Sequence, residues 1–60
     1  MVTDRILIID DDEKLANMLV EYLGKNGLVA EAKFTSTEGM AALKQKAFDA
    51  LVLDFMLPDI

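Results

Sequence analysis

A continuous aliphatic run that stops at three aspartates, Ile6-Leu7-Ile8-Ile9-Asp10-Asp11-Asp12, decides the fold of this chain. Strands that are covered on both faces are apolar without interruption, whereas half-exposed strands alternate with polar residues. The run therefore predicts a central strand of a parallel sheet. A second run of the same kind, Ala50-Leu51-Val52-Leu53, is also closed by an aspartate, Asp54.

Between the two runs, the sequence first predicts an amphipathic helix. It is expected from Glu13 to about Lys25, with Asp12 as the N-cap and Gly27 as the C-terminal stop. Its apolar residues recur at helical spacing, so we expect a stripe that faces the core. The stripe consists of Leu15, Met18, Leu19, Tyr22 and Leu23.

A second strand and a second helix are expected next. The strand alternates between an apolar face and a largely polar face, which is typical of an edge strand. The apolar face is formed by Leu28, Ala30, Ala32 and Phe34. The segment Thr35-Ser36-Thr37-Glu38 has the capping-box pattern and predicts a helix that ends near Lys46, although Gly39 is a weak helix former. Its apolar stripe is Met40, Leu43 and Ala47.

The order strand, helix, strand, helix, strand predicts an α/β fold, the βαβαβ unit of a doubly wound parallel sheet. Sixty residues allow one domain, and the hydrophobic fraction of 53% exceeds what a self-contained domain of this size needs. We therefore expect a piece of a larger fold. A net charge of −5 argues against binding a nucleic-acid backbone. Without a long apolar segment or a secretory signal, we expect a cytoplasmic protein.

Carboxylates follow both apolar runs. In parallel sheets, ligands bind beyond the carboxyl ends of the strands, so Asp10, Asp11 and Asp54 should converge there. Neighbouring carboxylates repel one another unless a cation or a proton bridges them. The chain has no cysteine and no histidine, and oxygen ligands are those that Mg²⁺ prefers. A metal beside a carboxylate can also clamp a phosphoryl group, which makes one of these acids a plausible nucleophile.

At these residues the chain resembles the receiver domains of two-component response regulators. Segment 6–12 looks like the first strand and acidic pair of that family, and Asp54-Phe55-Met56-Leu57-Pro58-Asp59 looks like the end of the phosphoacceptor strand and the following loop. The resemblance implies that Asp54 is the phosphorylated nucleophile, that Asp11 binds Mg²⁺ directly and Asp10 through water, and that the Met56 backbone carbonyl is a further ligand. Asp12 would be a helix cap only.

The resemblance also implies the wider context of the chain. Residues 1–60 would be a truncated receiver domain, the first three strands and two helices of a flavodoxin-like sheet with strand order 2-1-3. A sensor histidine kinase would supply the phosphoryl group. The Met-Leu-Pro ending is closest to the branch with a winged-helix effector, so DNA would be contacted only by a domain outside these residues. The family places a hydroxyl residue and a lysine beyond Ile60, so this chain is not expected to be an enzyme on its own.

The sequence also allows three other interpretations. Asp10 and Asp12 fit the D-x-D of haloacid-dehalogenase-like phosphatases as nucleophile and acid/base, but Lys14 departs from that motif and Asp54 is left unexplained. An EF-hand loop fails at Lys14 and lacks its glycine. Asp59 is expected to be a plain turn residue. The third alternative is a half-domain that only self-associates, as a homo-oligomer formed through the open edge of the third strand or through uncovered faces.

Overall fold

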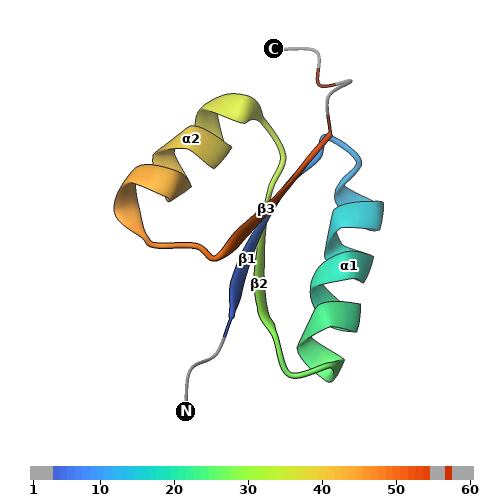
Figure 1. The fold of residues 1–60 in the computed structure, drawn as a ribbon. Helices are drawn as coiled ribbons and strands as arrows, with labels where there is room; N and C mark the ends of the chain where they lie inside the picture. Colours follow the sequence, from blue (N-terminus) through green and yellow to red (C-terminus); the bar gives the residue numbers. More distant parts are fainter. Residues whose placement is uncertain (1–3, 55–56, 58–60) are drawn as a thin grey trace.

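The computed structural model describes residues 4–54 and residue 57. Five elements follow one another along the chain (Figure 1). They are β1 (Arg5–Ile9), α1 (Glu13–Lys25), β2 (Val29–Lys33), α2 (Ser36–Gln45) and β3 (Ala50–Leu53). The predicted order of strands and helices is confirmed.

The strands form a three-stranded parallel sheet with the order β2-β1-β3. In the register of the sheet, Leu7 lies between Glu31 on β2 and Leu51 on β3. The first apolar run is therefore the central strand, as predicted. Figure 1 shows α1 on one side of the sheet and α2 on the other, which is the layering of a doubly wound α/β fold.

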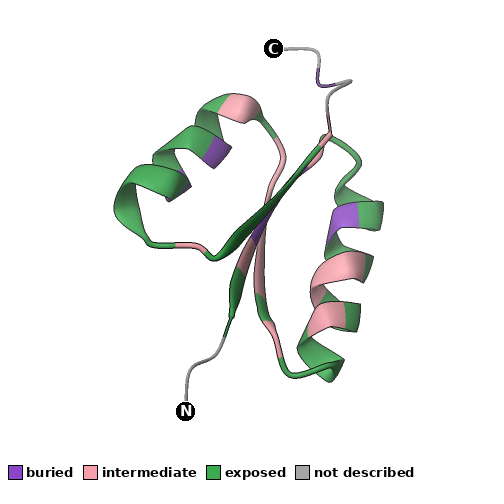
Figure 2. Cartoon of the chain, viewed as in Figure 1, coloured by how far each residue is buried: buried purple, intermediate pink, exposed green. Residues whose placement is uncertain are grey.

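The main core lies between β1 and α2. Leu7 and Ile9 pack with Ala42 and Leu57, each at most 5% exposed, and Phe48 packs against this cluster. Ile8 faces the opposite side of the sheet because side chains alternate along a strand, and Ala16 of α1 is fully buried. Figure 2 shows that most other positions are exposed or half-buried, so the core is small.

Both predicted helix starts are confirmed. The Asp12 side chain accepts a hydrogen bond from the backbone N–H of Leu15 at 3.0 Å and so caps α1. Thr35 caps α2, since its Oγ1 accepts from the N–H of Glu38 at 3.1 Å and lies 3.2 Å from Glu38 Oε1. After α1, Asn26 is the C-cap and Gly27 adopts a left-handed conformation with φ of 83°.

The predicted apolar stripe of α1 is wrong in part. Leu15, Met18 and Tyr22 are 44%, 59% and 63% exposed, whereas Leu19 and Leu23 are half-buried. The residue of α1 that is fully buried is Ala16, which the stripe did not include. The small side chain of Ala16 lets α1 approach the sheet closely, so the helix contacts the sheet at this residue. The side of the predicted stripe that carries Leu15, Met18 and Tyr22 therefore stays exposed.

The predicted stripe of α2 is also wrong, because Met40, Leu43 and Ala47 are exposed. The buried residues of α2 are instead Gly39 and Ala42. A Cβ atom on Gly39 would collide with Ile9, lying 2.7 Å from its Cγ1 atom. Gly39, which looked like a weakness of this helix, is therefore what allows α2 to lie close against β1.

Gly39→Ala is expected to lower the free energy of unfolding by about 1–2 kcal/mol, because overpacking costs more than the gain in helix propensity returns. The matched control is Gly24→Ala on α1, where a Cβ would meet nothing within 4 Å. Replacing Gly24 by alanine reduces the flexibility of the unfolded chain and improves helix propensity. This change should therefore raise the free energy of unfolding by about 0.5–1 kcal/mol. Urea denaturation of both variants measures the difference, and equal effects would contradict the close approach at Gly39.

Candidate metal and phosphoacceptor site

Three carboxylates meet beyond the ends of β1 and β3. One oxygen from each of Asp10, Asp11 and Asp54 lies within 4.8 Å of the other two. Asp10 and Asp54 are half-buried, and Asp11 is exposed. The predicted convergence of these side chains is therefore confirmed.

The parallel register brings the acids together. Ile9 and Leu53 are partners on the adjacent strands β1 and β3, so Asp10 and Asp54 each take the next position along. Their backbones stay tied to the sheet, since the N–H of Asp54 donates to the Ile9 carbonyl at 2.9 Å and the N–H of Asp10 donates to the Lys33 carbonyl at 3.0 Å. Asp10 and Asp54 are therefore held in position by backbone hydrogen bonds at the carboxyl ends of β1 and β3.

Asp12 contributes to the cluster with its backbone and not with its side chain. Its N–H donates to Asp10 Oδ1 at 2.9 Å, while its own carboxylate caps α1. The first hydrogen bond orients the Asp10 carboxylate, and the second occupies the Asp12 carboxylate at the helix start. The role of Asp12 as a cap agrees with the prediction, and the phosphatase interpretation, which needs Asp12 as acid/base, gains no support from this arrangement.

Leu57 is buried in the core, whereas the sequence analysis named it only as part of the segment that follows Asp54. Leu57 is 4% exposed in the core cluster, and its N–H donates to the Asp54 carbonyl at 3.3 Å. An apolar residue just before Pro58 was the available signal. The predicted ligand Met56 and the predicted turn residue Asp59 lie outside the described residues.

The cluster fits a hard divalent cation. Magnesium binds oxygen ligands at about 2.0–2.1 Å, so two ligands on opposite sides of the ion are about 4.2 Å apart. Oxygens within 4.8 Å of one another reach that geometry by small side-chain rotations, or with water as one ligand. Three neighbouring carboxylates also carry the negative charge that such an ion compensates.

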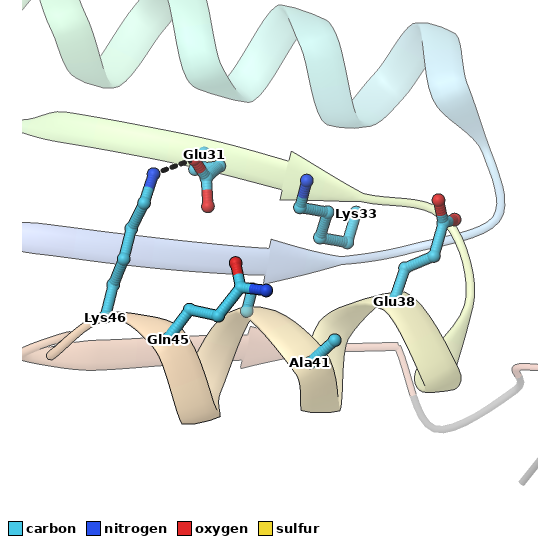
Figure 3. Close-up of a pocket in the computed structure, with 7 residues that line it drawn as sticks. Glu31, Lys33, Glu38, Ala41, Gln45 and Lys46 are labelled. Carbon is cyan, nitrogen blue, oxygen red and sulfur yellow. Dashed lines mark hydrogen bonds and ion pairs between the residues drawn. The ribbon is translucent and has the colours of Figure 1, made fainter.

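A hollow of about 220 Å³ lies between β2 and α2, away from the acidic cluster (Figure 3). Lys46 reaches across it to Glu31, with 2.9 Å between Nζ and Oε1. The hydrogen bond from Lys46 is the main cause of a lowered pKa of Glu31, helped by the nearby charges of Lys46, Lys33 and Arg5 and opposed by partial burial. The side chains of Lys46 and Glu31 are 48% and 32% exposed, so the pair is partly open to solvent.

Lys46→Gln is expected to raise the pKa of Glu31 toward its ordinary value. The pKa of Glu31 is lower in the folded chain than in the unfolded chain. The Lys46–Glu31 pair therefore stabilises the fold fully at pH values above the unfolded-state pKa of Glu31. This stabilisation is lost as the pH falls through the folded-state pKa. For an exposed pair the contribution is under about 1 kcal/mol. An NMR titration of the Glu31 carboxyl carbon measures the pKa. Lys25→Gln, which breaks the exposed Lys25–Glu21 pair, is the control and should leave it unchanged.

Comparison with known proteins identifies the family. The chain belongs to the response regulator receiver domain family, whose sequence model matches residues 6–60. It is thus related to the receiver domains of two-component response regulators, the class that the fold and the acidic cluster had indicated. No solved structure matches the chain.

Several curated relatives are transcriptional regulators. The chain is 30% identical over 59 residues to the regulatory protein VanRc of Enterococcus gallinarum, covering 98% of this chain and 26% of that protein. It is 41% identical over 56 residues to the transcriptional regulatory protein QseB of Haemophilus influenzae, covering 93% and 25%. It is 39% identical over 54 residues to RprY of Bacteroides fragilis, covering 90% and 23%. The chain therefore spans about a quarter of the length of these relatives.

Within residues 4–54, neither helix has the length and the apolar character needed to cross a membrane.

Proposed function

We propose that this chain is the phosphoacceptor part of a receiver domain, with Asp54 as the residue that is phosphorylated and Mg²⁺ as the cofactor. The observation that carries the proposal is the meeting of Asp10, Asp11 and Asp54 at the carboxyl ends of β1 and β3, in a chain that matches the receiver family over residues 6–60. Residues 1–60 would supply the first three strands and two helices of that domain.

Asp54 is the best candidate for the nucleophile because its backbone is fixed on both sides. Its N–H is bonded to β1, and its carbonyl accepts from the N–H of Leu57, which is held in the core. A carboxylate held in this way can be aimed at an incoming phosphorus atom without reorganising the loop. Asp11 directly and Asp10 through water would bind the cation, with the Met56 carbonyl as a further ligand.

The reaction is the transfer of a phosphoryl group to a carboxylate. An oxygen of Asp54 attacks the phosphorus of a phosphorylated imidazole, an O–P bond forms, and the N–P bond breaks. The imidazole nitrogen leaves with the electron pair and takes a proton from solvent. When bound, Mg²⁺ would neutralise charge on the transferred oxygens. Asp10, held by the Asp12 N–H, keeps its carboxylate beside the acceptor.

The proposal extends to partners. The imidazole donor would belong to a sensor histidine kinase, and DNA would be contacted by a winged-helix domain outside these residues. The chain is similar to QseB and RprY, which are transcriptional regulatory proteins, and this similarity supports the assignment. The chain itself would act as a regulatory module.

The decisive test is acceptance of a phosphoryl group by Asp54. In the presence of Mg²⁺ and a small acyl phosphate, the unaltered chain is expected to gain the mass of one phosphoryl group, and Asp54→Asn is expected to gain none. Asp4→Asn is the matched control, because Asp4 is an exposed acid at the start of β1, away from the cluster, and this variant should be modified like the unaltered chain. Modification that persists in Asp54→Asn, or none in the unaltered chain, would overturn the proposal.

A further inference from the structure

Asp12 joins the acidic cluster to the first turn of α1 through three hydrogen bonds. Its backbone N–H donates to Asp10 Oδ1 at 2.9 Å. Its own Oδ1 accepts from the N–H of Leu15 at 3.0 Å, and its carbonyl accepts from the N–H of Ala16 at 2.9 Å. Ala16 is fully buried against the sheet, so the helix side of this connection is held firmly.

The direction of the Asp12 N–H depends on the Asp12 side chain. The backbone of Asp12 is extended, with φ of −81° and ψ of 92°, and the helix begins at the next residue. The capping hydrogen bond to Leu15 holds this change of conformation at position 12. Without the cap, the first turn of α1 has a free N–H group and frays more easily, so the N–H at position 12 is no longer held toward Asp10.

The carboxylate of Asp12 is engaged at the helix, and the three oxygens that converge in the cluster come from Asp10, Asp11 and Asp54. Asp12 is nevertheless an exposed anion beside these residues, so its charge also attracts a cation through solvent. Two substitutions separate charge from position. Asparagine caps a helix as well as aspartate but carries no charge, whereas alanine has neither property.

We propose that Asp12 is a positioning residue of the cation site: by capping α1, its carboxylate fixes the backbone N–H that orients Asp10. This inference rests on the proposed function, in which Asp10 helps to bind Mg²⁺. Hydrogen-bond partners that orient the ligands of a metal are part of its binding site. The connection also acts in the opposite direction, because coupling between two sites is reciprocal. A cation that holds Asp10 therefore strengthens the cap, and the N–H of Leu15 opens less often.

Titration with Mg²⁺ of Asp12→Asn and Asp12→Ala, at a temperature where circular dichroism shows both to be folded, tests the proposal. Both variants lack the charge, so a difference between their Kd values reports on position alone. Asp12→Ala is expected to bind Mg²⁺ at least about tenfold more weakly than Asp12→Asn. Asn26→Ala is the matched control, because it removes the hydrogen bond of 2.8 Å from Asn26 Nδ2 to the Tyr22 carbonyl at the other end of α1. This variant should bind Mg²⁺ like the unaltered chain.

Amide hydrogen exchange followed by NMR completes the test. Mg²⁺ should slow exchange of the Leu15 N–H in the unaltered chain and in Asp12→Asn, but not in Asp12→Ala. Equal Kd values for Asp12→Asn and Asp12→Ala, or a Leu15 N–H that does not respond to Mg²⁺, would overturn the proposal.

The outcome is separate from that of the phosphoryl-transfer test. Equal Kd values in a chain that is phosphorylated on Asp54 would overturn the role of Asp12 and leave the proposed function standing. A difference in Kd in a chain that accepts no phosphoryl group would support the role of Asp12 and overturn the proposed acceptor. An unaltered chain that binds no Mg²⁺ would overturn both the role of Asp12 and the proposed cofactor.

Discussion

Replacement of Leu7 by alanine is expected to remove a large part of the free energy of unfolding of this chain. Leu7 is fully buried in the middle of the central strand, within the cluster that joins β1 to α2 and Leu57. Truncating a buried leucine to alanine costs about 2–5 kcal/mol. A chain of 60 residues has a total stability of roughly 3–9 kcal/mol at typical values per residue. The loss is therefore comparable to the whole stability.

Leu15→Ala is the matched control for this prediction. It removes the same atoms from a leucine of α1 that is 44% exposed, and alanine is the better helix former, so we expect a loss of about 1 kcal/mol or less. Circular dichroism with urea titration of both variants measures the free energies of unfolding. If Leu7→Ala were no more destabilising than Leu15→Ala, the core would not be centred on β1.

The strands and the helix starts were predictable because each depends on residues close together in the sequence. Uninterrupted apolar runs such as Ile6–Ile9 identify strands that are covered by other elements on both faces. Asp12 and Thr35 accept hydrogen bonds from backbone N–H groups in the first turn of their own helices. The parallel register then follows from the order of elements. For the same reason the convergence of Asp10 with Asp54 was predictable from the ends of two strands.

The core faces of the helices were less predictable, because they depend on how closely a helix approaches the sheet. The largest apolar residues of α2 were expected inside, yet Gly39 and Ala42 occupy the contact with Ile9 and Leu7. Hydrophobic periodicity weighs size and polarity, whereas a tight helix–sheet contact selects small residues. The role of Leu57 was missed for a related reason, since a single apolar residue in a loop has no periodicity to mark it.

The metal-free chain is expected to be more stable with asparagine at position 54 than with aspartate. The carboxylate oxygens of the cluster lie within 4.8 Å of one another, and like charges at that distance repel by about 1 kcal/mol in a water-like dielectric. Asparagine keeps the shape of the side chain and removes one charge. In the presence of a chelator, Asp54→Asn should therefore raise the free energy of unfolding by about 1 kcal/mol.

Saturating Mg²⁺ should reverse this order of stability. A ligand that binds only the folded chain stabilises it by about 2.7 kcal/mol at a concentration of one hundred times its Kd. The unaltered chain should gain this, while Asp54→Asn, with one ligand oxygen and one charge fewer, should gain much less. Thermal melts with and without Mg²⁺, at an ionic strength matched with sodium chloride, compare the unaltered chain with Asp54→Asn. The control variant Asp4→Asn should be stabilised by Mg²⁺ as much as the unaltered chain. Equal stabilisation of all three chains would mean that Mg²⁺ acts by general screening, and the cluster would then hold no specific ion.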